Sequence, residues 1–460
     1  MIHSAKTISV LGMLCCVLSA HAVTPFRDGE KVVFLGDSIT HGGWFICWAQ
    51  AIYQLRCPGK IVLDNAGIAG NSAGEGLARL EYDVLDKKPD RVFVMFGMND
   101  LGLTLYAKGG MGPDAVRRAR MENYEKNINR ICEGLKEAGI PAVLITPTPY
   151  NQYGKDNPSS YNEAGLAAAA GIIRKTAEER GLEVLEFHAP MTEILKKQPE
   201  ISPMRADNVH PNELGHLVMA YYLCKAAGLD GKIADVSIDA ADGKILKAEH
   251  AVIRDVKIPK AGKQEPAGTG PEGISFEYCP SRLPFIMDKR HEGIDSLVPF
   301  TEDFNTESMQ ITGLAEGEYQ ILADGVPIGT FSSADLAKGI NLAVINTPSR
   351  QQARKVFRQI EALRTCMSRL RSVVQGDRFA LSQNADLRDP ESCCKAADQW
   401  FKIHYADEKA SGRQYYANVV EEYKKNKRIL PDILKQMAAA YENLYRESHA
   451  VSYRIELKKL

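Results

Sequence analysis

The sequence contains little cysteine and almost no net charge. Its 460 residues include 10 cysteines and carry a formal net charge of −1 at pH 7. Such sparse cysteine excludes a small scaffold that depends on disulfides, and no Cys/His spacing is typical of a zinc site. The balanced charge excludes a protein that binds nucleic acid through its overall charge. The length predicts two or three domains.

Apolar runs long enough to cross a bilayer are also lacking. The run Ile8–Leu18 is too short for a membrane span, and it lies between Lys6 and the small-residue pattern Ala20-His21-Ala22. This order predicts a signal peptide over residues 1–22; a buried first strand or helix is the alternative. We expect the mature protein to be exported, periplasmic or secreted, with no integral membrane segment.

The cysteines beyond the signal peptide leave two possibilities open. An exported protein is allowed to form disulfides, and the sequence offers Cys47 with Cys57, or Cys366 with Cys393 or Cys394. Free buried thiols are the other possibility.

Short apolar runs alternate with amphipathic stretches between residues 31 and 228. The runs are Lys31–Leu35, Ile61–Asn65, Arg91–Phe96, Ala142–Thr146 and Glu183–Phe187. Near-continuous apolar strands that alternate with helices predict a parallel sheet covered on both faces. We therefore expect an α/β domain over residues 23–229.

The pattern changes after residue 229. Residues 230–346 contain short strands and turn residues, and Gly317–Phe331 is typical of a hairpin with an Asp324-Gly325 turn. They predict a small β-rich module. Residues 347–460 are predicted to be helical, from an N-cap at Ser349 to a last helix over Pro431–Leu457.

The helical region is basic. It contains 22 Lys and Arg against 14 Asp and Glu. A solvated helical surface explains this excess most simply, and contact with an anionic glycan or the cell envelope is the alternative.

Ser38 follows the first predicted strand in the stretch Val33-Phe34-Leu35-Gly36-Asp37-Ser38-Ile39-Thr40. Ser and Asp are preferred helix N-caps, so a capping role is one reading of Ser38. The other reading is a nucleophile, which requires a base and an oxyanion site.

A candidate base follows the fifth strand. Asp207-Asn208-Val209-His210 places a carboxylate and an imidazole three residues apart on a turn. The carboxylate would orient the ring of His210, and the other ring nitrogen would accept the proton of Ser38. Both segments follow strands, so they are expected at the sheet edge where open α/β sheets bind ligands.

Candidate oxyanion donors follow the second and third strands. Gly70 in Asn65–Ser72 offers an unhindered backbone N–H, and Asn99 in Phe96–Asp100 offers a side-chain amide. Preorganised donors of this kind stabilise a tetrahedral intermediate.

These four blocks, in this order, resemble the SGNH or GDSL-type hydrolase superfamily. The blocks are Gly36–Thr40 with Ile39 in place of Leu, Gly70, Gly97–Asp100 and Asp207–His210. The resemblance covers residues 29–228 and implies a flavodoxin-like three-layer α/β/α fold. It also implies a catalytic triad of Ser38, His210 and Asp207, and an oxyanion hole formed by Ser38, Gly70 and Asn99.

Gly70-Asn71-Ser72-Ala73-Gly74 offers a rival nucleophile, because it matches the GxSxG elbow of α/β-hydrolases. Against it, Ala66–Ala69 separate the strand from the expected sharp turn. Ser72 is therefore expected to belong to the loop that presents Gly70, and His216 is expected to cap or pack the last helix of the domain.

The triad fits acyl transfer through an acyl-enzyme, which needs no cofactor and no metal. Aromatic and polar residues are expected to wall the pocket: His41, Trp44, Tyr106, Tyr150 and Tyr153. Such a mixture suits a sugar ring, so we expect a serine esterase that removes O-acyl, mainly O-acetyl, groups from carbohydrate or another small ester. A lysophospholipase or thioesterase, and a glycan-binding adhesion protein with secondary esterase activity, are the alternatives.

Overall fold

A five-stranded parallel sheet organises the first half of the chain. The computed structural model describes residues 22–154, 161–259 and 270–460, so the predicted signal peptide lies almost wholly outside the described residues. The strand order β2-β1-β3-β4-β5 is flavodoxin-like and confirms the predicted fold. The strands are β1 (Lys31–Gly36), β2 (Val62–Gly67), β3 (Arg91–Met95), β4 (Ala142–Ile145) and β5 (Glu183–Leu185).

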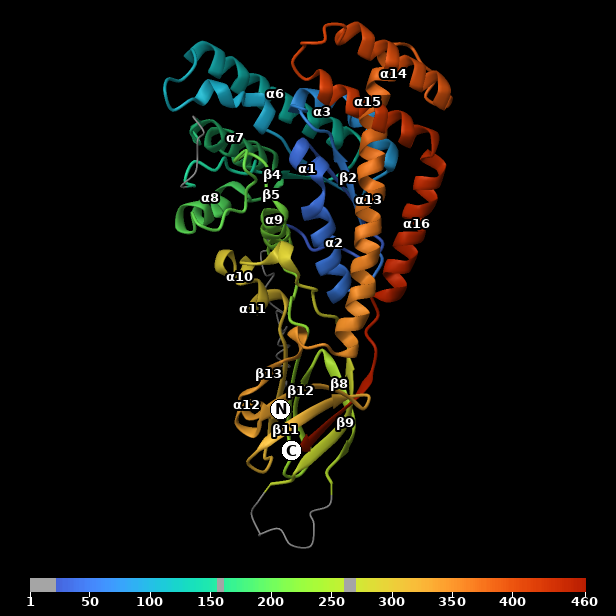
Figure 1. Ribbon diagram of the computed structural model, residues 1–460. Helices are drawn as coiled ribbons and strands as arrows, with labels where there is room; N and C mark the ends of the chain where they lie inside the picture. The colour runs from blue at the N-terminus through green and yellow to red at the C-terminus, as the bar shows by residue number, and fades with distance from the viewer. Residues whose placement is uncertain (1–21, 155–160, 260–269) are drawn as a thin grey trace, which may run out of the picture.

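Helices cover both faces of this sheet (Figure 1). They are α1 (Ser38–Gly42), α2 (Trp44–Arg56), α3 (Ala73–Ala78), α4 (Leu80–Asp83), α5 (Met98–Leu101), α6 (Asp114–Glu137), α7 (Ala164–Arg180), α8 (His188–Lys197) and α9 (Glu213–Ala226). Every residue of α2 is buried, because α9 packs against it on one side and a later helix, α13, on the other.

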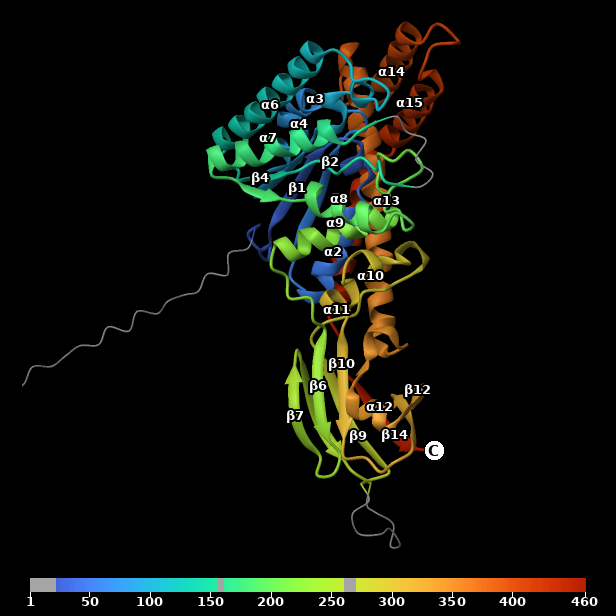
Figure 2. The same cartoon turned by 90° about the vertical axis from the view of Figure 1, so that its left-hand side faces the viewer.

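Two sheets that share one apolar core form the β-rich module (Figure 2). Their strand orders are β13-β10-β6-β7 and β12-β11-β14-β9-β8. The strands are β6 (Ala234–Asp239), β7 (Lys244–Glu249), β8 (Ala251–Lys257), β9 (Gly273–Pro280), β10 (Glu307–Thr312), β11 (Glu318–Ala323), β12 (Val326–Ser332), β13 (Ile340–Asn341) and β14 (Tyr453–Lys459). The short helix α12 (Ser333–Lys338) joins their core, whereas α10 (Ile294–Leu297) and α11 (Phe300–Phe304) contribute to the core of the α/β part.

The predicted hairpin is present as β11 and β12. Its turn residues Asp324 and Gly325 have φ values of 48° and 80°. Positive φ at both positions is the geometry of the tight hairpin turn that Asp-Gly favours.

The C-terminal helices run back along the α/β part (Figure 1). They are α13 (Pro348–Ser382), α14 (Pro390–His404), α15 (Arg413–Arg428) and α16 (Leu430–Glu447). Helices α13 and α16 cover the edge strand β2, where the Tyr445 hydroxyl donates to the Ile61 carbonyl over 2.9 Å. An uncovered edge strand is a site of unwanted pairing, so these helices protect the sheet.

Two predictions for this region were wrong. The last helix ends at Glu447, and Tyr453–Lys459 form β14 between β9 and β11. Tyr453, Ile455 and Leu457 are buried at every second position, which is strand periodicity. The N-cap of α13 is Thr347, whereas Ser349 lies inside the helix. The domain boundaries stay a prediction, with β14 added to the β-rich module.

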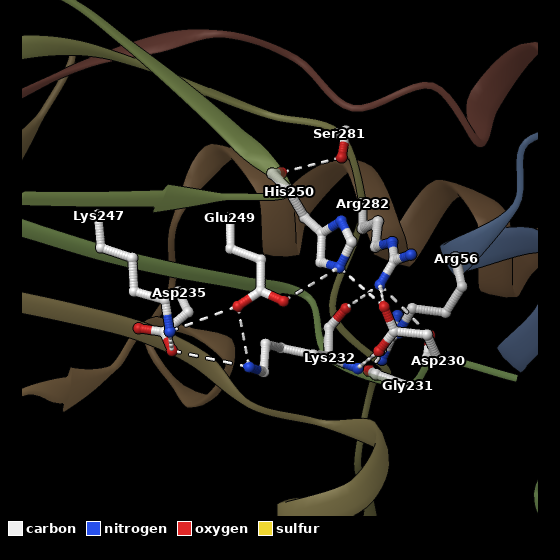
Figure 3. A network of polar contacts seen from close by, with 10 residues as sticks. All are labelled: Arg56, Asp230, Gly231, Lys232, Asp235, Lys247, Glu249, His250, Ser281 and Arg282. Carbon is white, nitrogen blue, oxygen red and sulfur yellow. Dashed lines mark hydrogen bonds and ion pairs between the residues drawn. The ribbon is translucent and has the colours of Figure 1, made fainter. Parts of the chain in front are cut away.

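Arg56 joins the α/β part to the β-rich module (Figure 3). Its buried guanidinium donates to the carbonyl oxygens of Gly231, Leu283 and Phe304. Beside it, Arg282 donates to the Asp230 carboxylate over 2.9 Å. Since each carbonyl belongs to a different segment, this one side chain holds three segments together at the junction between the two parts.

A buried ion-pair network joins α13 to the α/β part. Both guanidinium nitrogens Nη1 and Nη2 of Arg371 lie 2.8 Å from the Asp83 carboxylate, which also pairs with Arg79 over 2.5 Å. Burial alone would raise the pKa of Asp83, but the positive charges of Arg371, Lys87 and Arg79 outweigh burial and lower this pKa to about 2. The carboxylate is therefore charged at every pH at which the protein is expected to work.

The described part of the chain contains no helix long and apolar enough to cross a membrane. Its cysteines are all free thiols, so the disulfides considered from sequence are not formed: Cys47, Cys57, Cys132, Cys224, Cys279, Cys366, Cys393 and Cys394.

Replacement of Arg371 by Leu should lower the free energy of unfolding by about 3 kcal/mol, because it removes one partner of a buried ion pair. Urea denaturation measures this loss. Arg358→Leu on the exposed face of the same helix is the control and should change stability by about 0.5 kcal/mol or less. Equal losses in both variants would contradict a special role of the network.

Candidate functional site

Ser38 lies just beyond the carboxyl end of β1, where it is the first residue of α1. The Asp37 carboxylate caps α1 by accepting the Ile39 N–H over 3.0 Å. Since Asp37 provides the cap, the Ser38 hydroxyl is left for another partner. A Cβ at Gly36 would lie 2.1 Å from Thr40 Oγ1, so only glycine permits this close turn.

The hydrogen-bond partner of the Ser38 hydroxyl is His210. Ser38 Oγ lies 2.8 Å from His210 Nε2, and His210 Nδ1 lies 2.7 Å from Asp207 Oδ2. Burial raises the pKa of Asp207, but hydrogen bonds from the backbone and ring of His210 outweigh it and hold this pKa below its usual value. A charged Asp207 beside Nδ1 fixes the ring tautomer with Nε2 free to accept a proton.

The Asp207–His210 turn is held by its backbone. Asn208 adopts φ 61°, a conformation that Asn tolerates better than most residues. The Arg205 N–H donates to the His210 carbonyl over 2.7 Å, and the Asn151 N–H donates to the Asn208 carbonyl over 2.9 Å. The imidazole is therefore presented from a fixed loop.

Two candidate oxyanion donors lie beside Ser38. Gly70 has φ 80° and open space where a Cβ would stand. The Asn99 side-chain amide donates one hydrogen to the Asn71 carbonyl over 2.9 Å, and an amide has a second hydrogen to offer. Both groups line the same cavity as Ser38.

Arg79 connects these donors to the buried ion pair of α13. It donates to the Gly36 carbonyl over 2.8 Å and to Asn71 Oδ1 over 2.9 Å. Asn71 in turn accepts from Asn99. One buried guanidinium therefore holds both the turn before Ser38 and Asn71, the residue that supports Asn99.

Two buried carboxyl groups lie under the site. Burial raises the pKa of Asp37 to about 7 and that of Asp100 to about 6. Asp100 accepts the N–H groups of Ala73 and Gly97 over 2.9 and 3.1 Å. It thereby ties the loops that carry Gly70 and Asn99 to each other.

A cavity of about 630 Å³ opens over Ser38 and His210. Apolar side chains of Met98, Leu103 and Val209 line part of it. Tyr415 and Tyr416 of α15 also line it, although they lie far away in the sequence. The C-terminal helices therefore contribute an aromatic wall to the candidate site.

The residues predicted to wall the pocket lie elsewhere. His41, Trp44, Tyr106, Tyr150 and Tyr153 are not among the residues that line this cavity. Trp44 is buried against Trp48 with a ring separation of 4.7 Å, and Arg364 of α13 covers it. Tyr106 and Tyr150 are buried, and Tyr153 accepts from Gln152. Packing of helices and loops therefore buries Trp44, Tyr106 and Tyr150, whereas His41 and Tyr153 are partly buried.

His41, His216 and Ser72 make contacts that stabilise the fold around the candidate site. His41 Nδ1 accepts the Ala69 N–H over 3.1 Å, next to Gly70. His216 is buried and stacked parallel to Phe45. Ser72 caps α3 in a reciprocal pair with Glu75, so it has the loop position expected for it and not that of a nucleophile elbow.

Comparison with known proteins agrees with this geometry. Residues 34–218 match the GDSL-like Lipase/Acylhydrolase family, and this range contains all four sequence blocks. Residues 34–218 therefore form a domain of the SGNH/GDSL hydrolase superfamily. The protein is a carboxylic ester hydrolase, as the match to the acylhydrolase family and the similarity to an acetylxylan esterase and an arylesterase indicate.

The relatives differ in their named substrates. A gut microbial diltiazem-metabolizing enzyme of known structure is 29% identical, with a TM-score of 0.85 over 96% of this chain and 100% of its own. An acetylxylan esterase of Geobacillus stearothermophilus is 25% identical over 44% of this chain and 96% of its own. A thioesterase, protease and lysophospholipase of Escherichia coli is 25% identical over 43% of this chain and 82% of its own.

Sequence reasoning missed Tyr415, Tyr416 and Arg79. Tyr415 and Tyr416 are part of an amphipathic helix, and no local pattern indicates which distant cavity a helix will face. Arg79 gave no signal either, because it touches the candidate donors only through Asn71 and the backbone.

The hydrolase activity should depend on Ser38. Ser38→Ala should lower kcat on p-nitrophenyl acetate at least about 10³-fold, because the candidate nucleophile is lost while the fold persists. Ser72→Ala is the comparison and should retain most activity, losing about 1 kcal/mol of stability with its helix cap. An inactive Ser72→Ala beside an active Ser38→Ala would reverse the assignment.

Asp37→Asn should stabilise the protein at high pH. The pKa of Asp37 rises from 3.8 to about 7 on burial, so the folded state favours the protonated form and ionisation opposes folding. Below pH 3.8 the two proteins should be equally stable, and the advantage of Asn should grow up to pH 7, to at most about 4 kcal/mol. Asn keeps the helix cap.

Urea denaturation at pH 4, 6 and 8 measures this difference in stability. Asp86→Asn, at an exposed position, is the control that should show no such trend. A pH-independent effect of Asp37→Asn would contradict the buried ionisation.

Proposed function

We propose that this hydrolase removes O-acyl groups, mainly O-acetyl, from carbohydrate through a Ser38-His210-Asp207 triad. The observation that supports it most is the continuous hydrogen-bond chain from Ser38 Oγ through His210 to Asp207, at 2.8 and 2.7 Å. This chain ends in an open cavity that also holds Gly70 and Asn99.

In the proposed reaction, His210 Nε2 accepts the Ser38 proton as Oγ attacks the ester carbonyl carbon. The N–H groups of Ser38 and Gly70 and the Asn99 amide stabilise the oxyanion. His210 then donates the proton to the leaving alcohol, and an acyl-enzyme forms on Ser38. A water molecule, deprotonated by His210, releases the acid and restores the serine.

The lining of the cavity favours an ester whose alcohol carries a ring. Tyr415 and Tyr416 offer aromatic faces, and a sugar ring has apolar C–H faces that pack on such rings. The named activity of the acetylxylan esterase relative agrees with this choice. The expected partner is therefore an acylated carbohydrate or another small ester.

Two alternatives remain distinguishable by experiment. A lysophospholipase or thioesterase has the support of the Escherichia coli relative's name. A glycan-binding adhesion protein with secondary esterase activity would retain glycan without releasing acetate. Export, inferred from the apolar segment before Ala22, fits each of these roles.

Glycan or envelope contact by the basic helices has less support. Part of their charge is internally paired: Lys427 with Asp377 over 2.7 Å, and Lys424 with Asp398 over 2.9 Å. Arg371 is buried against Asp83. The pairs within the helices do not change the excess of positive charge, whereas the pairs of Arg371 with Asp83 and of Arg378 with Glu75 lower it, because these carboxylates lie outside the helices.

Hydrolysis rates on p-nitrophenyl esters of rising acyl length should fall steeply beyond about four carbons. Acetate release from acetylated xylan, mannan and cellulose oligosaccharides should exceed that from a Ser38→Ala control. A preference for long acyl chains would favour the lysophospholipase or thioesterase, and glycan retention without acetate release would favour the binding protein.

A further inference from the structure

A second hollow adjoins the cavity above Ser38. It has a volume of about 720 Å³ and lies between α3 and α6. Gly70 and Asn99 line both hollows, so the two meet at the candidate oxyanion donors. Figure 1 shows α6 and α15 on either side of α3, at the same end of the molecule.

The first turns of α6 leave this hollow open. The buried residues of α6 begin at Tyr124, whereas the helix starts at Asp114. Ala115, Ala119 and Asn123 follow each other at four-residue spacing and line the hollow, so they share one helix face. Two alanines on that face leave room for a ligand where larger side chains would fill it.

Polar groups line the same hollow as the alanines. Glu75 of α3 and Arg120 of α6 line the hollow together with Asn99 and Asn123. Arg378 of α13 pairs with Glu75 over 3.0 Å, and Arg120 donates to the Asp100 carbonyl over 3.1 Å. Both pairs hold their side chains in place at the rim.

This lining selects among ligands. A long acyl chain would remove the carboxylate of Glu75 and the guanidinium of Arg120 from water without replacing their hydrogen bonds, which costs free energy. A phosphate would meet the Glu75 carboxylate. Sugar hydroxyl groups donate to a carboxylate and accept from a guanidinium or amide, so a chain of sugar units satisfies every polar group present.

Aromatic side chains lie at the opposite end, in the cavity over Ser38. Tyr416 is stacked on Tyr405 with a ring separation of 4.9 Å and lies 5.5 Å from Trp400. Trp400 is itself stacked on Phe379 at 3.9 Å. Because the tyrosine is backed by other rings, it presents a fixed wall and not a mobile side chain.

Resting on the proposed carbohydrate esterase activity, we propose that the two hollows form one cleft that binds an acylated oligosaccharide. The ester-bearing sugar lies over Ser38 beside Tyr415 and Tyr416, and neighbouring sugar units occupy the hollow between α3 and α6. The enzyme thereby prefers acetylated oligosaccharides to acetylated monosaccharides.

The test compares kcat/KM for partially acetylated xylo-, manno- and cello-tetraoses with that for the corresponding acetylated monosaccharides, and with phenyl acetate. At least one tetraose should exceed its monosaccharide about tenfold. Ala119→Trp fills the hollow and should remove most of this advantage. Ala115→Trp is a second filling variant, in case the first does not fold.

Arg118→Trp is the matched control, because Arg118 is exposed on the same helix and is not among the residues that line the hollow. It should keep the tetraose advantage. An advantage that survives both filling variants, or a wild-type enzyme with equal kcat/KM for tetraose and monosaccharide, would overturn the extended cleft alone. Hydrolysis of phenyl acetate without hydrolysis of any saccharide would overturn the carbohydrate esterase as well.

Discussion

The buried carboxylate of Asp83 is the interaction on which the arrangement of the molecule depends. Arg371 reaches it from α13 and Arg79 from the α/β part. Arg79 also holds the Gly36 and Ala66 carbonyls, where β1 and β2 approach their carboxyl ends. A buried charge is tolerated only while it is paired, so the helix and the loops of the candidate site hold each other in place.

This connection makes the C-terminal helices part of the enzyme's scaffold. They cover the β2 edge, bury Trp44, and bring Tyr415 and Tyr416 to the cavity over Ser38. The similarity to a diltiazem-metabolizing enzyme extends over 96% of the chain, so the whole architecture, and not the family domain alone, is shared with another enzyme. Arg56 adds a fixed junction to the β-rich module.

The sequence predicted what local patterns encode. Five apolar runs became the parallel sheet, and the segments after its strands brought Ser38, Gly70, Asn99 and His210 together, because the carboxyl ends of parallel strands meet at one edge. The aromatic wall was beyond prediction, since only the packing of α13 buries Trp44 and only the packing of α15 brings Tyr415 to the cavity. The last strand was mistaken for helix because Tyr453–Lys459 closely follow an amphipathic helix, and their apolar residues continue its apolar pattern.

The position of β14 has a consequence for biosynthesis. This strand is formed by residues 453–459 and lies in the middle of its sheet, between β11 and β9. The ribosome makes β14 after every other strand of this sheet, so β9 and β11 each keep an unpaired edge after they and the α/β sheet have been made. Unpaired edges invite association with other chains. The nascent protein therefore needs protection from aggregation until β14 has emerged and inserted between β9 and β11.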